Sequence, residues 1–127
     1  MDAIHLIKTD TTPGIHLDKK NNIFLFEGIS LPEKVHEFYK PVLEWLDDYV
    51  KNSNSETIVI FKLDFYSTTS SKLIYEILSK FNFLYEEGKK VEIEWHFSDE
   101  DEDMEESGEE LADLLSVPFT FKSYISE

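Results

Sequence analysis

The pattern of hydrophobic and polar positions that organises the chain lies between residues 57 and 81, TIVIFKLDFYSTTSSKLIYEILSKF. The first part is rich in β-branched and aromatic residues and predicts a strand that is buried on both faces at its start. One face would carry Val59, Phe61, Leu63 and Phe65, and the other would carry Ile58 and Ile60. Apolar residues at helical spacing follow from Leu73 to Leu84 and predict an amphipathic helix that ends at Glu87-Gly88.

Five consecutive hydroxyl residues join this strand to this helix: Ser67, Thr68, Thr69, Ser70 and Ser71. A side-chain oxygen there can accept from the free amides of the first helical turn, so we predict Thr69 or Ser70 as the N-cap. One cap explains one hydroxyl. The others fit either spare solvated residues of a capped turn or a phosphorylation site, because a phosphate would face free amides and the positive end of the helix dipole.

The N-terminal part predicts short strands followed by a helix. Residues 4–8 and 22–28 have strand patterns, and Asn21-Asn22 between short strands predicts a hairpin. A helix is predicted from residue 31 to about residue 50, with Ser30 as N-cap and Glu33 completing a capping box. Pro41 lies inside this pattern and is expected to bend or interrupt the helix.

The C-terminal part predicts a half-buried strand, an acidic loop, a short helix and an edge strand. Residues 91–97 alternate strictly, so the inward side chains are predicted to be Val91, Ile93, Trp95 and Phe97. Residues 98–110 contain nine carboxylates and are expected to form a solvated loop. A short helix would carry Leu111, Leu114 and Leu115, and residues 119–124 would form the last strand. This order of elements predicts an α/β domain over residues 1–127, with a mixed sheet and helices mainly on one face.

Charge and composition narrow the functional classes. The chain has 27 acidic and 12 basic residues, a net charge of −15, which disfavours nucleic acid and anionic membranes as partners and leaves basic protein surfaces. There is no cysteine, so disulfides, thiolate zinc sites and cysteine nucleophiles are excluded. The first ten residues lack the pattern of a secretory signal, and apolar runs are too short to cross a membrane. The expected location is the cytoplasm, and no cofactor is expected.

The acidic segment also raises the possibility of calcium. Asp99, Asp101, Asp103 and Glu110 have the spacing of positions 1, 3, 5 and 12 of a calcium loop. Met104 stands where that loop needs glycine, and a strand precedes it where a helix should. A calcium-responsive binding module is therefore the weaker interpretation, and we expect no metal site.

Four segments in this order resemble the SiaC family of bacterial regulatory phosphoproteins, which is itself similar to the STAS domains of anti-anti-sigma factors. They are TDTTPGIHLD (9–18), LPEKVHEFY (31–39), FYSTTSSKLIYEIL (65–78) and VEIEWHF (91–97), and together they span nearly the whole chain. The chain departs from the family at Ser67, where the family usually has asparagine.

The resemblance implies a STAS-like single domain and a switch at the strand-to-helix corner. It places the family's phosphorylated threonine at Thr68, with Thr69 and Ser70 as fallback sites if the register differs. A dedicated kinase and a metal-dependent serine/threonine phosphatase would act on Thr68. The unmodified protein would bind and activate a diguanylate cyclase and so raise cyclic di-GMP. The expected partner-binding residues are Asp64, Tyr66, Ser67, Thr68, Thr69, Ser70 and Lys72.

A small acidic enzyme is the alternative from another class. Asp64 with Ser67 or Thr68 could be imagined as a base and a nucleophile. None of the four histidines has a motif context that would complete such a set, and the chain has no GxSxG, P-loop or dinucleotide-binding pattern. We therefore expect a non-catalytic adaptor with no catalytic residues.

Overall fold

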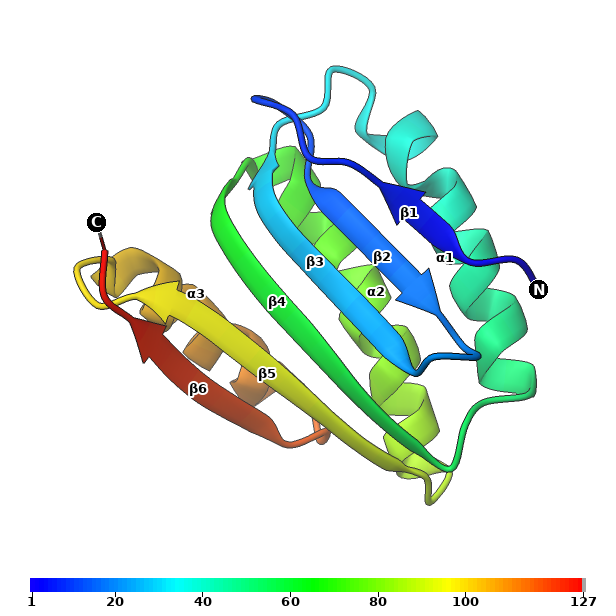
Figure 1. The fold of residues 1–127 in the computed structure, drawn as a ribbon. Helices are drawn as coiled ribbons and strands as arrows, with labels where there is room; N and C mark the ends of the chain where they lie inside the picture. Colours follow the sequence, from blue (N-terminus) through cyan, green and yellow to red (C-terminus); the bar gives the residue numbers. More distant parts are fainter. Residues whose placement is uncertain (127) are drawn as a thin grey trace.

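Strands and helices alternate after an N-terminal hairpin in the computed structural model, which describes residues 1–126 (Figure 1). The elements are β1 (Ile4–Leu6), β2 (Gly14–Asp18), β3 (Ile23–Ser30), α1 (Val35–Lys51), β4 (Glu56–Tyr66), α2 (Thr68–Glu86), β5 (Lys90–Ser98), α3 (Glu102–Leu114) and β6 (Phe119–Tyr124).

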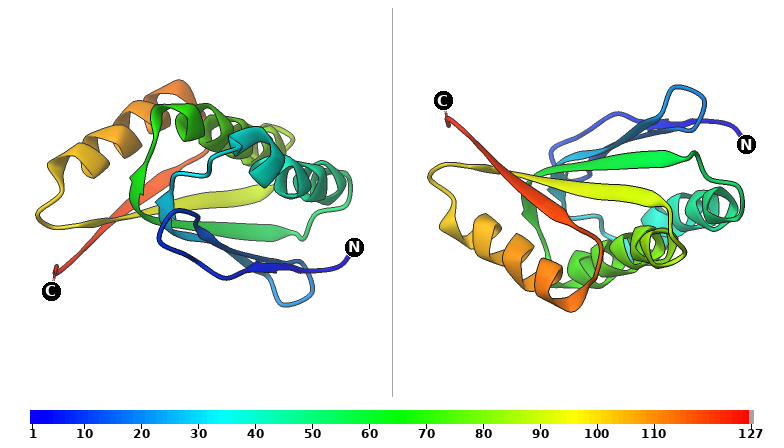
Figure 2. Two further views of the ribbon diagram at one scale, coloured as in Figure 1. Left: turned by 90° about the horizontal axis from the view of Figure 1, so that it is seen from above. Right: turned by 90° about the horizontal axis from the view of Figure 1, so that it is seen from below.

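All six strands form one mixed sheet in the order β1-β2-β3-β4-β5-β6. The strands from β1 to β3 pair antiparallel, and the strands from β3 to β6 pair parallel. The predicted hairpin joins β2 to β3, and Asn22 has a φ of 56° in the turn, a conformation that asparagine tolerates. The three helices cover one face of the sheet and leave the other face open (Figure 2). The prediction of a mixed sheet with helices on one face is confirmed, while the STAS-like label stays a prediction.

The hydrophobic core lies between the sheet and the helices. The four inward positions predicted on β5 are confirmed, because Val91, Ile93, Trp95 and Phe97 are all buried. Aromatic rings stack across neighbouring strands, with Phe26 against Phe61 and Phe61 against Trp95 at centroid distances of 4.7 and 5.7 Å. This aromatic row crosses β3, β4 and β5, and its Trp95 end lies against α3.

A β-bulge near the end of β4 corrects the predicted faces of that strand. Gly28 pairs with Leu63 but Ile29 pairs with Phe65, so Asp64 is an extra residue on β4. The extra residue turns Phe65 away from the core, and its side chain is 51% exposed. Ile58 lies on the open face and is also exposed, so the prediction that the strand starts buried on both faces was wrong. Val59, Phe61 and Leu63 are buried as predicted.

The start and the middle of α1 also differ from the prediction. Strand β3 continues through Ser30, and α1 begins at Val35 after Lys34, whose side chain makes no capping bond. Ser30 is fully buried, so the predicted capping box with Glu33 was wrong. Pro41 lies inside one continuous helix and does not interrupt it. Proline removes one backbone bond there, and the inward stripe of α1, which includes Val42 and Leu46, holds the helix on the core.

The acidic segment is largely helical, which corrects the predicted loop. Asp101 caps α3, because its side chain accepts from the Met104 amide at 3.0 Å. Carboxylates in the first turn suit the positive end of the helix dipole. Met104 and Gly108 are buried one turn apart, and the Met104 carbonyl accepts from Trp95 Nε1 at 2.9 Å. A helix is recognised in a sequence from apolar side chains that recur every three or four residues. Here one of the inward positions is Gly108, which has no side chain, so the helical pattern was hard to recognise.

We predict that Gly108→Ala destabilises the protein. Alanine in a helix interior ordinarily stabilises by about 1 kcal/mol relative to glycine. Here a Cβ on Gly108 would lie 2.5 Å from the Trp95 ring and 2.8 Å from Phe121, so we expect a net loss of about 1–3 kcal/mol in the free energy of unfolding, measured in urea. Glu109→Ala on the exposed side of α3 is the matched control and should be neutral. A Gly108→Ala protein as stable as wild type would contradict the close packing of α3.

Candidate functional site at the start of helix α2

The hydroxyl-rich corner is formed where β4 turns into α2. Ser67 has extended backbone angles, φ −74° and ψ 165°, and its Oγ accepts from the Ser70 amide at 3.1 Å. Ser67 is therefore the N-cap of α2, and the prediction of Thr69 or Ser70 as the cap was wrong. Thr68 consequently occupies the first position of the helix, beside amides that have no partner within the helix.

The remaining hydroxyls of the corner differ sharply in exposure. Thr68 and Thr69 are exposed, and Thr69 Oγ1 lies 3.0 Å from Ser67 Oγ. Ser70 is fully buried. Ser71 is half-buried and donates through its Oγ to the Thr68 carbonyl at 2.6 Å. Thr68 is thus an exposed residue of the corner whose own hydroxyl takes no part in these side-chain bonds.

A buried hydrogen-bond network beneath the corner joins three elements. Ser30 Oγ at the end of β3 donates to Ser70 Oγ at 2.8 Å, and Ser70 Oγ donates to the Ser30 carbonyl at 3.0 Å. Tyr39 Oη on α1 lies 2.6 Å from Ser30 Oγ. The same Ser30 carbonyl accepts from the Ser67 amide at 3.1 Å, which extends the pairing of β3 and β4 to the cap. Burial raises the pKa of Tyr39 to about 12, although the bond with Ser30 lowers it, so the phenol is neutral near pH 7.

Other predicted site residues lie beside the corner rather than within this network. Asp64 is the exposed bulge residue and accepts from Tyr124 Oη at 3.4 Å. Tyr66 is half-buried and packs edge-on against Trp95 at a centroid distance of 6.5 Å, and burial raises the pKa of its hydroxyl. Lys72 is exposed one turn after Thr68. The structure therefore brings Ser67, Thr69 and Ser70 together and leaves Asp64 and Tyr66 on the side of β5, β6 and α3.

Sequence reasoning missed four residues around the corner. Ser30 and Tyr39 belong to the buried network, whereas the sequence predicted Ser30 as a helix cap and placed Tyr39 only within the helix from residue 31 to about residue 50. Leu31 and Phe65 flank the corner with exposed apolar side chains, 42% and 51% accessible. An inward hydroxyl at a strand end leaves no signal in a single sequence, whereas the exposure of Phe65 follows from the bulge.

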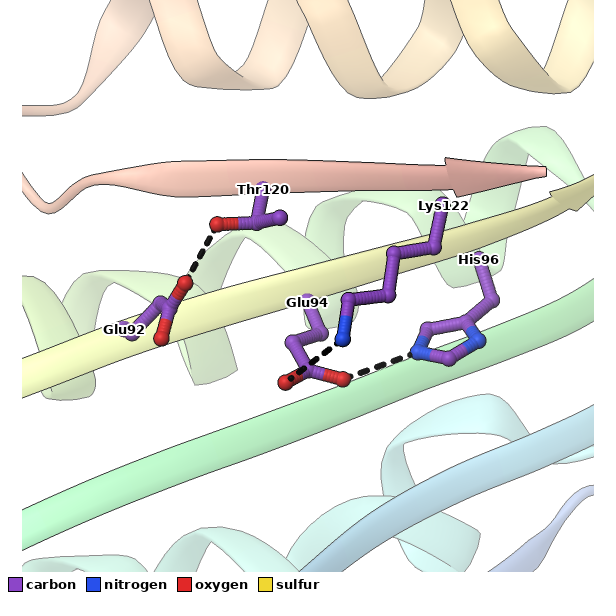
Figure 3. Close-up of polar contacts among 5 residues, drawn as sticks. All are labelled: Glu92, Glu94, His96, Thr120 and Lys122. Atoms are coloured by element: carbon purple, nitrogen blue, oxygen red, sulfur yellow. Dashed lines mark hydrogen bonds and ion pairs between the residues drawn. The ribbon is translucent and has the colours of Figure 1, made fainter.

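The open face of the sheet carries a separate polar cluster on β5 and β6 (Figure 3). The Glu94 carboxylate contacts His96 Nε2 at 3.0 Å and Lys122 Nζ at 3.4 Å, and Glu92 accepts from the Thr120 hydroxyl. The bond to His96 lowers the pKa of Glu94, with a smaller contribution from Lys122 and against partial desolvation. These side chains alternate with the four inward residues of the half-buried strand 91–97, and Glu94 pairs with both His96 and Lys122 on this face.

Neither a metal site nor a membrane-spanning helix is found within residues 1–126. No group of three or more histidine, aspartate and glutamate side chains there is arranged to hold a metal ion. Of the four residues with calcium-loop spacing, Asp103 and Glu110 lie in helix α3, and Asp101 is the cap of that helix. No helix in that part of the chain is both long and apolar enough to cross a membrane.

The fold and the corner define a small two-layer α/β domain with an exposed threonine at a helix start. The SiaC family model, described as SiaC family regulatory phosphoprotein, matches residues 6–124. The chain belongs to the SiaC family, a family of regulatory phosphoproteins.

Individual proteins and structures agree with this assignment. An uncharacterized protein of Pseudomonas aeruginosa strain UCBPP-PA14 is 25% identical over 124 residues, which cover 98% of each chain. The structure of SiaC of Pseudomonas aeruginosa has a TM-score of 0.88 at 23% identity, over 98% of this chain and 100% of that one. A crystal structure of the diguanylate cyclase SiaD in complex with its activator SiaC, from the same species, has a TM-score of 0.89 at 25% identity, over 95% and 99% of the two chains.

We predict that the Ser30 network stabilises the corner in a non-additive way. Ser30→Ala would leave the buried Tyr39 hydroxyl without its partner and should cost about 1–3 kcal/mol of unfolding free energy. Tyr39→Phe should cost less, because Ser30 keeps its bond to Ser70. The double variant should unfold no more easily than Ser30→Ala alone, since it removes both partners together. Strictly additive losses in urea unfolding would argue that the two hydroxyls act independently.

The Glu94 cluster predicts a pH-dependent part of the stability. A carboxyl whose pKa is lower in the folded state stabilises the protein above its unfolded pKa and stops doing so as pH falls through the folded pKa. Glu94→Gln should therefore lower the unfolding free energy at pH 7 by roughly 0.5–1 kcal/mol and have no effect well below pH 4. Glu56→Gln, at an exposed position, is the control. A Glu94→Gln deficit that is equal at both pH values would show that packing, not charge, is responsible.

Proposed function

We propose that this protein is a non-catalytic signalling adaptor whose partner binding is controlled by reversible phosphorylation of Thr68. In its unmodified form it binds and regulates a diguanylate cyclase. The observation that carries the proposal is the exposed Thr68 at the first position of α2, behind the Ser67 cap, in a member of a family of regulatory phosphoproteins. A related protein, SiaC, is the activator of the cyclase SiaD with which it was crystallised.

Exposure and hydrogen bonding favour Thr68 over the two fallback acceptors. Ser70 is fully buried and bonded to Ser30, so a kinase could reach it only by opening the network. Thr69 is exposed, but its hydroxyl is in contact with the cap oxygen of Ser67. The Thr68 side chain is exposed and free of such a contact, and a phosphate on it would lie at the start of the 19-residue helix α2.

The same position explains how modification would release a partner without unfolding the domain. Free amides and the helix dipole stabilise a phosphate at the first helical position. Leu31 and Phe65 are exposed near the corner and offer apolar contact surface. A partner packed over this surface would have to desolvate the added charge, which weakens binding. We assign Asp64, Tyr66, Ser67, Thr68, Thr69 and Lys72 to the partner-binding surface, with Ser70 maintaining its shape from beneath.

The proposal includes the absence of catalysis. Among residues 1–126, the hydroxyls of Ser67, Ser70 and Ser71 bond to other hydroxyls and to backbone groups and not to a histidine or a carboxylate. His16 stacks on His5, and His96 bonds to Glu94 on β5. A nucleophile paired with a base, which an enzyme acting through the corner would need, is therefore not assembled at the corner.

The enzymes that add and remove the phosphate complete the proposal. We expect a dedicated protein kinase and a metal-dependent serine/threonine phosphatase to act on Thr68, as the family resemblance implies. A cytoplasmic location belongs to the same proposal. The net charge of −15 agrees with protein partners and disfavours nucleic acid and anionic membranes.

We predict that Thr68→Glu weakens binding to the cognate diguanylate cyclase by a hundredfold or more, on the order of several kcal/mol, while the protein melts near the wild-type temperature. Thr68→Ala should bind normally but accept no phosphate, and Thr69→Ala is the matched control that keeps Thr68 available. Calorimetry with the cyclase measures the affinity, and mass spectrometry after incubation with the kinase locates the phosphate. Phosphate found only outside residues 67–71, or undiminished binding by the Thr68 phosphoprotein, would refute the proposal.

A further inference from the structure

A groove runs along the helix face between α1 and α2 and begins at Leu73, which directly follows Lys72. The two helices pack side by side on the sheet (Figure 2). Two depressions lie along their seam, with volumes of about 350 and 380 Å³. Asp47 of α1 and Glu76 of α2 line both, so the two depressions adjoin along the seam, and together they are called the groove. Its α2 wall extends from Leu73 to Phe83, eleven residues that span about 15 Å of helix.

Two exposed aromatic residues line the α2 side of this groove. Tyr75 and Phe83 are 40% and 50% accessible, and they stand at positions i and i+8 of α2, so they lie on one side of the helix with Ser79 between them. The core stripe of the same helix, which includes Ile77 and Phe81, is fully buried. Tyr75 and Phe83 are therefore outside the core and give the α2 wall of the groove an apolar surface that is exposed within residues 1–126.

Charge around the groove has one predominant sign. Glu37, Glu44, Asp47 and Glu76 line it, against Lys40 and Lys80. Lys80 Nζ bonds to Asp47 Oδ1 at 2.5 Å across the seam, so one lysine and one carboxylate neutralise each other. The other three carboxylates face Lys40 alone. An apolar wall with an acidic rim complements a segment that carries apolar side chains on one side and basic side chains at its edges.

We propose that the groove between α1 and α2 binds an amphipathic, basic α-helix of a partner protein. A straight seam of about three helical turns suits a helix whose apolar side chains recur at i, i+3, i+4 and i+7. Large aromatic side chains are the residue types that most often dominate such contacts. A second copy of this chain is a poor occupant, because two chains of net charge −15 repel each other.

This surface is independent of the proposed function. Its lining residues include none of the residues from Asp64 to Lys72, so the groove can be tested without modifying Thr68. Loss of binding in the groove and loss of cyclase release by Thr68 phosphorylation are separate outcomes.

The test uses the full-length protein and a synthetic 18-residue peptide of leucine and lysine, with leucine at i, i+3, i+4 and i+7. Binding is measured by calorimetry, and the contact surface by backbone NMR shifts. We expect the shifts to cluster on both walls of the groove, and Tyr75→Ala with Phe83→Ala to weaken binding by tenfold or more. Tyr85→Ala is the matched control, because Tyr85 is 39% exposed on the same helix but does not line the groove, and it should change affinity less than twofold.

A charge test separates the groove from general attraction to an acidic protein. Glu44→Lys with Glu76→Lys should weaken peptide binding by tenfold or more at low salt, whereas Glu106→Lys with Glu109→Lys on α3 should weaken it no more than threefold. A scrambled peptide of the same composition should bind at least tenfold more weakly. Equal losses from both charge pairs, shifts on α3, or undiminished binding by the aromatic variants would overturn the proposal. Self-association that the aromatic variants abolish would assign the groove to a second copy instead, and would also overturn it.

Discussion

The backbone and side chain of Ser30 hold the corner together. Its carbonyl accepts from Ser67 and Ser70, and its hydroxyl bonds to Ser70 and Tyr39. One residue at the end of β3 thereby joins the cap of α2 to the second turn of α1, and Ser30, Ser70 and Tyr39 are all buried. Buried hydroxyls are costly when unpaired, so these bonds depend on one another and fix where α2 can begin. The exposure of Thr68 is a consequence of this arrangement.

Much of the fold could be predicted because its patterns are local. Strand β5 alternates strictly, and the asparagine pair between β2 and β3 is a strong turn signal, so both were predicted correctly. The failures involve partners that are distant in sequence. Ser30 seemed to be a helix cap because its bonds to Ser70 span forty residues, and the cap on Ser67 depends on the same contacts. At the site, the run of five hydroxyl residues was enough to locate the corner in the sequence. Which of these hydroxyls are exposed and which are buried, as Ser70 is, could be learned only from the structure.

The two sides of the sheet have different electrostatic character. Helix α3 adds seven carboxylates to the helix side and has no basic residue. On the open side, Glu94, His96 and Lys122 satisfy one another, and Lys62 lies 4.7 Å from the centre of the Tyr124 ring. A basic partner approaching from solution is therefore drawn toward the helices and not toward the bare sheet. The open side can still present the apolar residues Ile58 and Phe65 to a partner of little charge.

The bulge at Asp64 determines which face of the sheet each later side chain of β4 points to. Side chains on a strand alternate between its faces, so one extra residue exchanges the two faces from that point on. Tyr66 thereby faces Trp95 while Phe65 faces solvent. Regular pairing of the same residues, without the bulge, would point Phe65 toward the core and Tyr66 toward solvent. The bulged pairing of β4 with β3, as much as the identity of the residues between Leu63 and Ser67, therefore determines which aromatic ring is exposed beside the corner.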